Sequence, residues 1–306
     1  MAENNKIWTI GKILKWTEQY FAQKGVENPR LDAEVLLSHV VGKQRIYLYV
    51  HFDEPLQAEE LVAYREMIRQ RVDHVPVAYI LGEKEFMGLT FAVTPDTLVP
   101  RPDTEILVQA AIERLKKRQA AEPDRKSSLR FADIGTGTGA VCLSVLNFTE
   151  ATAADTVDIS PAARAVAEQN ARSFGLAERV SFYTGDLLVP LRNQQYAAIL
   201  SNPPYIPEAD IDSLAPEVRS REPLTALSGG KDGLNFYRRL CTEAPAMLES
   251  GGFMALEVGI HQAAKVAILA GENPLITRTE ILKDYAGIDR VVVAWKEMED
   301  NADKDC

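Results

Sequence analysis

Cysteine, histidine and long apolar runs are all scarce in this sequence of 306 residues. Its three cysteines lie far apart and form no Cys-x-x-Cys pair, which argues against a disulfide framework and a zinc site. The four histidines are scattered without the spacing of metal ligands. No apolar run approaches the roughly 18 residues of a membrane span, and no signal peptide opens the chain. We therefore expect a cytoplasmic protein with reduced thiols, without a bound metal and without membrane contact.

Positively charged residues are also fewer than negatively charged ones. The chain has 34 Lys and Arg residues and 44 Asp and Glu residues, which gives a formal net charge of -10. A chain of this charge lacks the basic surface that bulk nucleic acid requires, so we expect no direct nucleic-acid binding. Hydrophobic residues make up 46% of the chain, which is enough for a substantial core in one large domain or two smaller ones.

The N-terminal part of the chain has the apolar periodicity of helices. Apolar residues recur at helical spacing over residues 10–25, 31–42 and 58–72, and Gly25 and Gly42 stand where helices are expected to end. We predict a helical bundle over residues 1–75, which serves either as a scaffold or to bind a substrate protein. Residues 76–100 are richer in β-branched and aromatic side chains, and they predict a β-hairpin linker.

A second domain is expected over residues 101–298, followed by a flexible polar tail at 299–306. It begins with a helix that reaches residues 116–118 and has Asp103 or Thr104 as its N-cap. Strand and helix patterns then alternate, which predicts a mostly parallel, doubly wound α/β sheet whose ligands bind beyond the carboxyl ends of the strands. The candidate strands are residues 129–135, 156–160, 180–186, 196–202, 251–259, 277–284 and 290–297.

Three local features refine this second domain. Ser160 followed by Pro161 predicts the start of a helix, and Pro245 is expected to interrupt a later one. The second strand candidate is poor in large apolar residues, so we expect it to be short or irregular.

The stretch "DIGTGTGA", residues 133–140, joins the first strand of this domain to a helix. With Ala140 in the last place it fits the pattern G-x-G-x-x-G/A, in which glycines let a ligand approach the backbone closely. Asp158 follows at the end of the next strand, where a carboxylate can hold ribose hydroxyls. We predict an adenosine-containing ligand here, with a purely structural glycine turn as the alternative. Its candidate contacts are Gly135, Thr136, Gly137, Thr138, Gly139 and Asp158.

Charge helps to choose between a dinucleotide and S-adenosyl-L-methionine as that ligand. Asp133, Asp158 and Asp186 are all expected near the carboxyl ends of adjacent strands. Three carboxylates around one pocket disfavour a pyrophosphate and suit a cationic sulfonium. We therefore favour S-adenosyl-L-methionine.

The segment Asn202-Pro203-Pro204-Tyr205 ends the fourth strand candidate. Each proline fixes its own φ and favours an extended residue before it, so the loop is stiff and has few competing N–H donors. The Asn202 side-chain oxygen and the Pro203 carbonyl can then accept both N–H bonds of one planar NH2 group, while Tyr205 offers an aromatic face. Such positioning suits methyl transfer to a poor nitrogen nucleophile. The alternative is a proline turn that only ends the strand.

Together, "DIGTGTG", "VDIS" and "SNPPYI" resemble S-adenosylmethionine-dependent methyltransferases that modify planar NH2 groups. "PVAYILGEKEF", "LVPRPDTE", "EPLTALSGGKDGL" and "GGFMALEVG" are similar to the HemK/PrmC family, the N5-glutamine methyltransferases of class I peptide chain release factors. The resemblance extends over nearly the whole chain. It implies a class I, Rossmann-like, seven-stranded methyltransferase domain with a small helical N-terminal domain. It also implies a release factor as the partner, methylated on the glutamine of its Gly-Gly-Gln motif.

The resemblance implies a role for each matching residue. Residues 135–139 and Asp158 would bind the cofactor, and Asp186 and Leu187 would flank its adenine. Asn202, Pro203, Pro204 and Tyr205 would bind the substrate amide, with Asn202 also bordering the cofactor. Catalysis would rest on Asn202, Pro203 and Tyr205. Some family members have an aromatic residue where this chain has Leu187, so apolar contact would replace stacking there.

Three other functions fit parts of the pattern. An adenine-N6 methyltransferase acting on DNA or RNA would use the same Asn-Pro-Pro-Tyr logic, but the acidic chain disfavours it. A nicotinamide-dependent oxidoreductase would use the glycine loop and leave Asn-Pro-Pro-Tyr unexplained. A non-catalytic binding module would tolerate the loss of the Asn202 side chain.

Overall fold

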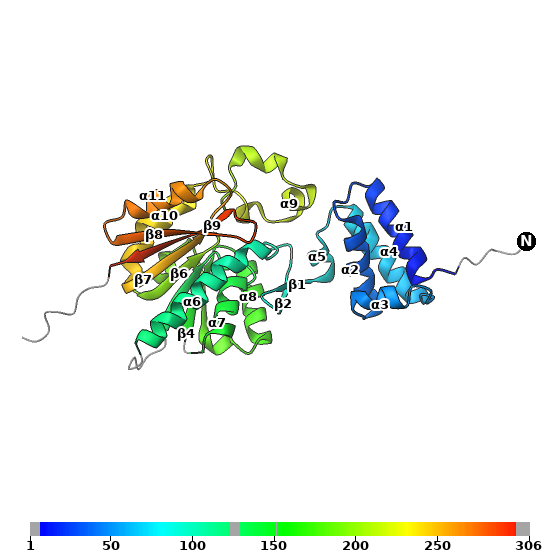
Figure 1. Ribbon diagram of the computed structural model, residues 1–306, viewed down its shortest axis with the longest axis horizontal. Helices are drawn as coiled ribbons and strands as arrows, with labels where there is room; N and C mark the ends of the chain where they lie inside the picture. Colours follow the sequence, from blue (N-terminus) through cyan, green and yellow to red (C-terminus); the bar gives the residue numbers. More distant parts are fainter. Residues whose placement is uncertain (1–6, 123–128, 151, 298–306) are drawn as a thin grey trace, which may run out of the picture. The chain divides into compact units, whose positions relative to one another are not determined.

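The computed structural model describes residues 7–122, 129–150 and 152–297 (Figure 1). Contacts divide the chain into two compact units: residues 1–83 with 215–221, and residues 84–214 with 222–306. The expected linker at residues 76–100 is therefore divided between the two units. The expected tail at 299–306 lies outside the described residues.

The first unit is a bundle of helices, in agreement with its apolar periodicity. Its core includes Phe21, Leu36, Leu37 and Tyr64, all fully buried, and the Tyr64 hydroxyl donates to the Ala33 carbonyl at 2.9 Å. The helices are α1 (Ile10–Gln23), α2 (Pro29–Val41), α3 (Arg45–Val50), α4 (Ala58–Val72), α5 (Val77–Leu81) and α9 (Pro216–Arg221).

Helix α9 belongs to this unit although it follows the Asn-Pro-Pro-Tyr segment in the chain. Arg71 of α4 is buried and forms ion pairs with Asp32 at 2.7 Å and with Glu217 of α9. Arg221 also donates from Nη2 to the Asp73 carbonyl. A buried guanidinium needs such partners, because an unpaired buried charge is costly.

The second unit opens with a hairpin of β1 (Glu83–Phe86) and β2 (Leu89–Ala92). Phe86 and Phe91 of the hairpin are buried in the core of this unit. The Asn170 side chain accepts from the Ala92 N–H at 2.8 Å and donates to the carbonyls of Ala92 and Thr138 at 3.0 and 2.9 Å. One buried amide thus joins the hairpin to the glycine loop.

Seven strands of the described part form one sheet in the order β5-β4-β3-β6-β7-β9-β8. The first five of these pair in parallel, whereas β9 is antiparallel to both of its neighbours. This confirms the predicted fold class. The strands are β3 (Leu129–Ile134), β4 (Thr152–Asp158), β5 (Val180–Thr184), β6 (Tyr196–Ser201), β7 (Leu248–Glu257), β8 (Ile276–Lys283) and β9 (Asp289–Lys296).

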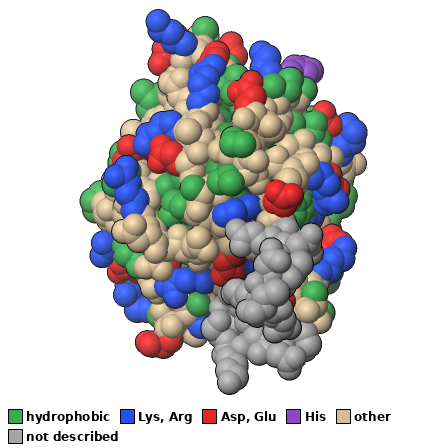
Figure 2. All heavy atoms as spheres, turned by 90° about the vertical axis from the view of Figure 1, so that its left-hand side faces the viewer, with side chains coloured by type: hydrophobic (Ala, Val, Ile, Leu, Met, Phe, Trp, Pro, Cys, Tyr) green, Lys and Arg blue, Asp and Glu red, His purple; other side chains and the backbone are tan. Residues whose placement is uncertain are grey.

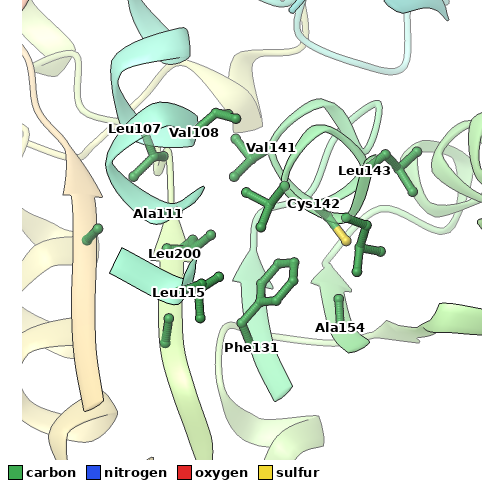
Figure 3. Close-up of a cluster of buried hydrophobic side chains, with 14 of the residues drawn as sticks. Leu107, Val108, Ala111, Leu115, Phe131, Val141, Cys142, Leu143, Ala154 and Leu200 are labelled. Carbon is green, nitrogen blue, oxygen red and sulfur yellow. The ribbon is translucent and has the colours of Figure 1, made fainter. Parts of the chain in front are cut away.

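Helices cover both faces of the sheet (Figure 1). Helices α6 (Glu105–Ala121), α7 (Ala140–Phe148) and α8 (Pro161–Ser173) lie on one face, and α10 (Asn235–Glu243) and α11 (Ala263–Gly271) lie on the other. Figure 3 shows Leu107 and Leu115 of α6 and Cys142 of α7 pointing toward Phe131 and Leu200 of the sheet. Burial of these apolar side chains fixes the strands whose carboxyl ends carry the candidate site.

Local sequence signals explain several element boundaries. Ser160 caps α8, because its hydroxyl accepts from the Ala163 N–H at 3.2 Å, and α10 ends just before Pro245, as predicted. The expectation of a short second strand is wrong, since β4 has seven residues. Five of its seven residues are buried, among them both threonines, which suit a pleated surface. None of the helices in the described ranges is long and apolar enough to cross a membrane.

Candidate active site

A cavity of about 500 Å³ opens at the carboxyl ends of β3, β4 and β6, entirely within the second unit. This volume and position are typical of small-molecule sites in α/β proteins. Nine of the predicted site residues line it: Gly135, Thr136, Gly137, Thr138, Asp158, Asp186, Leu187, Asn202 and Pro204. Three other predicted residues, Gly139, Pro203 and Tyr205, are not among its lining residues.

The glycines of the loop have a left-handed backbone. Gly135 has φ +78° and Gly137 has φ +54°, values that side-chain-bearing residues rarely adopt. A Cβ atom at Gly135 would lie 4.0 Å from the Asn202 carbonyl oxygen, which is an ordinary contact, so the positive φ and not the space is what favours glycine there. At Gly139 a Cβ would lie 2.9 Å from Leu143 and 3.4 Å from Ala167, so that glycine allows close packing between helices instead.

Asp158 joins the glycine loop to the next strand. Its two carboxylate oxygens accept from the backbone N–H groups of Gly137 and Ser160, both at 2.9 Å. Burial raises the pKa of Asp158, and these hydrogen bonds to the charged form act in the opposite direction. Each oxygen keeps a further lone pair, so the carboxylate can still accept from ribose hydroxyls in the cavity.

Asp133 does not belong to the cavity wall, contrary to the expectation of three carboxylates around one pocket. Its side chain is 1% exposed and lies under the loop, where it accepts from the Thr136 hydroxyl at 2.8 Å and from the Cys142 N–H at 3.3 Å. Burial raises the pKa of Asp133 to about 7, although both hydrogen bonds lower it. Asp133 therefore shapes the loop and contributes nothing to the wall.

Asp186 lines the cavity but already has a cationic partner. Arg239 of α10 donates to both of its oxygens, at 2.9 and 2.8 Å. This fork neutralises much of the carboxylate charge, so the electrostatic argument for a cationic ligand rests mainly on Asp158. Leu187 next to it has φ +47°, a left-handed conformation in which its side chain lines the cavity.

Asn202 stands where the sequence places it, directly after β6. Its amide nitrogen Nδ2 donates to the Thr104 hydroxyl at 3.1 Å. Thr104 is the N-cap residue of α6, as one of the two predicted candidates, but its side chain forms no capping hydrogen bond and contacts Asn202 instead. With its NH2 end held by Thr104, Asn202 has its carbonyl oxygen left to accept from another group.

The rest of the Asn-Pro-Pro-Tyr segment is held by neighbouring backbone and side chains. Pro203 is buried, and the Tyr205 carbonyl accepts from the Gln262 amide at 2.9 Å. Ile206 then forms a backbone hydrogen bond to Leu227 at 3.0 Å and accepts one from Gly229 at 2.9 Å. Burial raises the pKa of Tyr205 to about 12, so its phenol stays protonated at neutral pH.

Several cavity residues were not predicted as site residues from the sequence. They are Leu98, Arg101, Thr104, Pro223, Leu224 and Phe236. Arg101 forms an ion pair with the buried Glu222 across 121 residues of chain. All but Phe236 lie in or beside two stretches that the sequence analysis noted, "LVPRPDTE" and "EPLTALSGGKDGL". These two stretches were quoted only for the family resemblance, and their residues were given no role in a binding site.

Two family models match the chain. The "PrmC N-terminal domain" matches residues 12–82, and the "Methyltransferase small domain" matches residues 110–217. These segments fall in the helical bundle and in the part of the sheet that carries the glycine loop and Asn202.

Curated relatives match over nearly the whole chain. A release factor glutamine methyltransferase of Geobacter sulfurreducens is 43% identical over 95% of this chain and 98% of its own length. The protein of the same name from Moorella thermoacetica is 41% identical over 95% of this chain and all of its own length.

A solved structure shares the fold. The hMettl16 catalytic domain, in complex with the MAT2A 3'UTR hairpin 6, has a TM-score of 0.56 over 77% of this chain and 83% of its own. Its sequence identity is 12%, so the likeness concerns the fold alone.

Proposed function

Because the chain belongs to the release factor glutamine methyltransferase family, we propose that it methylates class I peptide chain release factors. The acceptor is the side-chain amide nitrogen, N5, of the glutamine in their Gly-Gly-Gln motif, and the donor is S-adenosyl-L-methionine. One observation carries the proposal. The Asn202 amide lies at the cavity wall with its NH2 end bonded to Thr104, which leaves its carbonyl oxygen to accept from a substrate amide.

The cavity fits the proposed donor in size and in chemistry. About 500 Å³ lies within the range of small-molecule sites, and Asp158 offers acceptors for ribose hydroxyls. Residues 135–138 of the glycine loop, which line the cavity, would accommodate the amino-acid part, while Asp186 and Leu187 would border the adenine. Leu187 offers apolar contact there, and Phe236 also lines the cavity.

The substrate amide would be held by two acceptors, the Asn202 side-chain oxygen and the Pro203 carbonyl. Accepting both N–H bonds aims the nitrogen and counters the delocalisation of its lone pair into the carbonyl. When bound, S-adenosyl-L-methionine would supply an electrophilic methyl group: the bond from the sulfonium sulfur to that methyl group would break as the bond to the amide nitrogen forms, which leaves a neutral thioether and a nitrogen with one proton to lose. Positioning of this kind can supply a large part of a rate enhancement.

No residue of the segment has to act as a base. Asparagine and proline do not take up protons at neutral pH, and the raised pKa of Tyr205 keeps its phenol neutral. The proton can pass to water after the methyl group has been transferred. Tyr205 is proposed to pack its ring against the planar amide and thereby complete the substrate site.

The helical bundle is proposed to bind the release factor. Helix α3 and the turn that follows it carry Ile46, Val50 and Phe52, each more than 60% exposed. Ile46 and Val50 lie one helical turn apart, so both present apolar side chains on the same face of α3, where a partner protein could cover them. Since release factors act on ribosomes, the reaction would take place in the cytoplasm.

A nucleic-acid substrate has less support. Figure 2 shows acidic and basic side chains interspersed over the visible described residues of one face. Together with the net charge of -10, this argues against the electrostatic footprint of a DNA methyltransferase.

The experiment that tests the proposal offers both acceptors to the purified protein. It is incubated with methyl-labelled S-adenosyl-L-methionine and either a class I release factor or duplex DNA. We expect label on the release factor, and mass spectrometry should assign one methyl group to the Gly-Gly-Gln glutamine. A release factor with Glu in place of that glutamine should stay unlabelled. Label on DNA alone would overturn the proposal.

A further inference from the structure

Glu257 is a buried carboxyl group directly beside the proposed acceptor. Strands β6 and β7 are parallel neighbours with Ser201 paired to Leu256, so Asn202 and Glu257 are the next residues along the two strands. The Glu257 side chain is 1% exposed, and its Oε2 atom has no hydrogen-bond partner among the described residues. A carboxyl group in such a place is costly, which calls for a functional reason.

The polar side chains next to Glu257 come from several elements. The side chains of Thr104, which is 4% exposed, and of Asn202 favour its charged form, and the charges of Arg290 and Asp103 act on it from β9 and from the turn before α6. Burial raises the pKa of Glu257 to about 7 against the effects of Thr104, Arg290 and Asn202, while Asp103 adds to the rise. Arg290 itself is held by Asp103 and Asp284, both at 3.0 Å.

This arrangement bears on the direction in which the Asn202 amide points. The two ends of an amide have nearly the same shape, so packing alone does not select one of them. A carboxylate only accepts hydrogen bonds, whereas the amide NH2 only donates and its oxygen only accepts. An ionised Glu257 beside Asn202 therefore attracts the NH2 end and repels the oxygen. The same carboxylate can take the Thr104 hydroxyl hydrogen, which leaves the Thr104 oxygen to accept from Nδ2, as observed at 3.1 Å.

We propose that Glu257 is a positioning residue which, directly and through Thr104, fixes the Asn202 amide with its oxygen toward the substrate. The proposal rests on the proposed function, because it assigns Glu257 a purpose only if Asn202 accepts a hydrogen bond from the substrate amide. Glu257 itself is not among the cavity-lining residues, so it acts through Asn202 and not on the reacting atoms.

Two substitutions at Glu257 separate charge from shape. Glu257→Gln keeps the volume but loses the acceptor-only group, and the Asn202 amide can then turn over. We expect kcat for release-factor methylation to fall by about 10²-fold, the order that misplacement of a reacting group costs. The dissociation constant for S-adenosyl-L-methionine, measured by calorimetry, should stay unchanged. Glu257→Asp keeps the charge on a shorter side chain, so this variant should keep a much higher kcat than Glu257→Gln.

If Glu257 had a purely structural role, the order of kcat for the two variants would be reversed. The isosteric Gln variant would then be the more active one, and the Asp variant, which leaves a gap in the core, the less active and less stable one. Equal activity of Glu257→Gln and wild type would also overturn the proposal. Glu113→Gln, the same chemical change on the exposed face of α6, should leave kcat unchanged and serves as the control.

Thr104 provides a second test that does not depend on how well the Glu257 variants fold. Thr104→Ser keeps the hydroxyl and should keep kcat, whereas Thr104→Val keeps the shape and should lower it. Equal kcat values for the two variants would overturn the proposal. Absence of methylation by the wild-type protein would instead overturn the proposed function, so the two failures are distinguishable.

Discussion

The Asp158 carboxylate at the end of β4 accepts a hydrogen bond from the Gly137 backbone N–H at 2.9 Å. Two motifs that lie 21 residues apart in the chain are thereby joined at one edge of the cavity. The carboxylate stiffens the glycine loop and also faces the space proposed for the ribose. Substitutions there should therefore affect the binding of the donor more than that of the release factor.

Replacement of Asp158 by Ala should weaken the binding of S-adenosyl-L-methionine. Hydrogen bonds to a charged group contribute about 1.5–3 kcal/mol, so the dissociation constant should rise by about 10- to 100-fold. Asp158→Asn keeps one acceptor and should lie between Ala and wild type. Isothermal titration calorimetry measures all three constants. An unchanged constant for the Ala variant would place the ribose elsewhere.

Two glycines of the same loop should respond differently to alanine. At Gly139 the new Cβ would lie 2.9 Å from Leu143, and φ is +81°, so Gly139→Ala should lower the free energy of unfolding by about 1 kcal/mol or more. At Gly137 a Cβ meets nothing within 4 Å, but the residue lines the cavity. Gly137→Ala should therefore weaken donor binding relative to Gly139→Ala. Chemical denaturation and calorimetry of both variants check this, and the opposite ranking would contradict it.

Stability should decrease as the pH rises from about 4 to about 7. Burial raises the folded-state pKa values of Asp133 and Glu257 from 3.8 and 4.5 to about 7 each. The folded protein therefore holds these protons more tightly than the unfolded chain does, and the associated stability is lost between about pH 4 and about pH 7. Thermal unfolding across this range should show the decline.

Neutral variants provide the control for this pH dependence. Asp133→Asn and Glu257→Gln should each flatten the decline, because each removes one carboxyl group whose pKa burial raises to about 7. Glu113→Gln, at an exposed residue, should leave the slope as it is in the wild-type protein. A slope that survives in both neutral variants would show that other groups cause it.

The Arg239–Asp186 pair should matter little for stability. Its side chains are 39% and 50% exposed, and exposed pairs contribute about 0–1 kcal/mol. Arg239→Ala should therefore change the free energy of unfolding by less than about 1 kcal/mol. Urea denaturation measures this change, and a loss of several kcal/mol would show that the pair supports the fold.

The sequence predicted the fold class well because each clue was local. Glycine spacing, the Ser160 cap and Pro245 act within a few residues, and alternating strand and helix patterns leave few topologies. Asn202 and Asp158 could be placed near one edge because the carboxyl ends of parallel strands meet there. These inferences needed no knowledge of side-chain contacts.

The misplaced and missed residues depend on contacts between distant parts of the chain. Asp133 was expected in the cavity wall, but it lies beneath the glycine loop, where the Thr136 hydroxyl and the Cys142 N–H meet it. Arg239 neutralises Asp186 from 53 residues away, and Thr104 meets Asn202 from 98 residues away. Such pairings are set by the packing of α6 and α10 on the sheet, which no local pattern encodes.

The Asn202 side chain tests the account most directly. Wild-type protein and Asn202→Ala are each incubated with S-adenosyl-L-methionine and a class I release factor, and mass spectrometry quantifies the methylated Gly-Gly-Gln glutamine. We predict near-complete loss of methylation in the variant, with donor binding by calorimetry partly retained. Methylation by Asn202→Ala at the wild-type rate would contradict the assignment of Asn202 as the acceptor that holds the substrate amide.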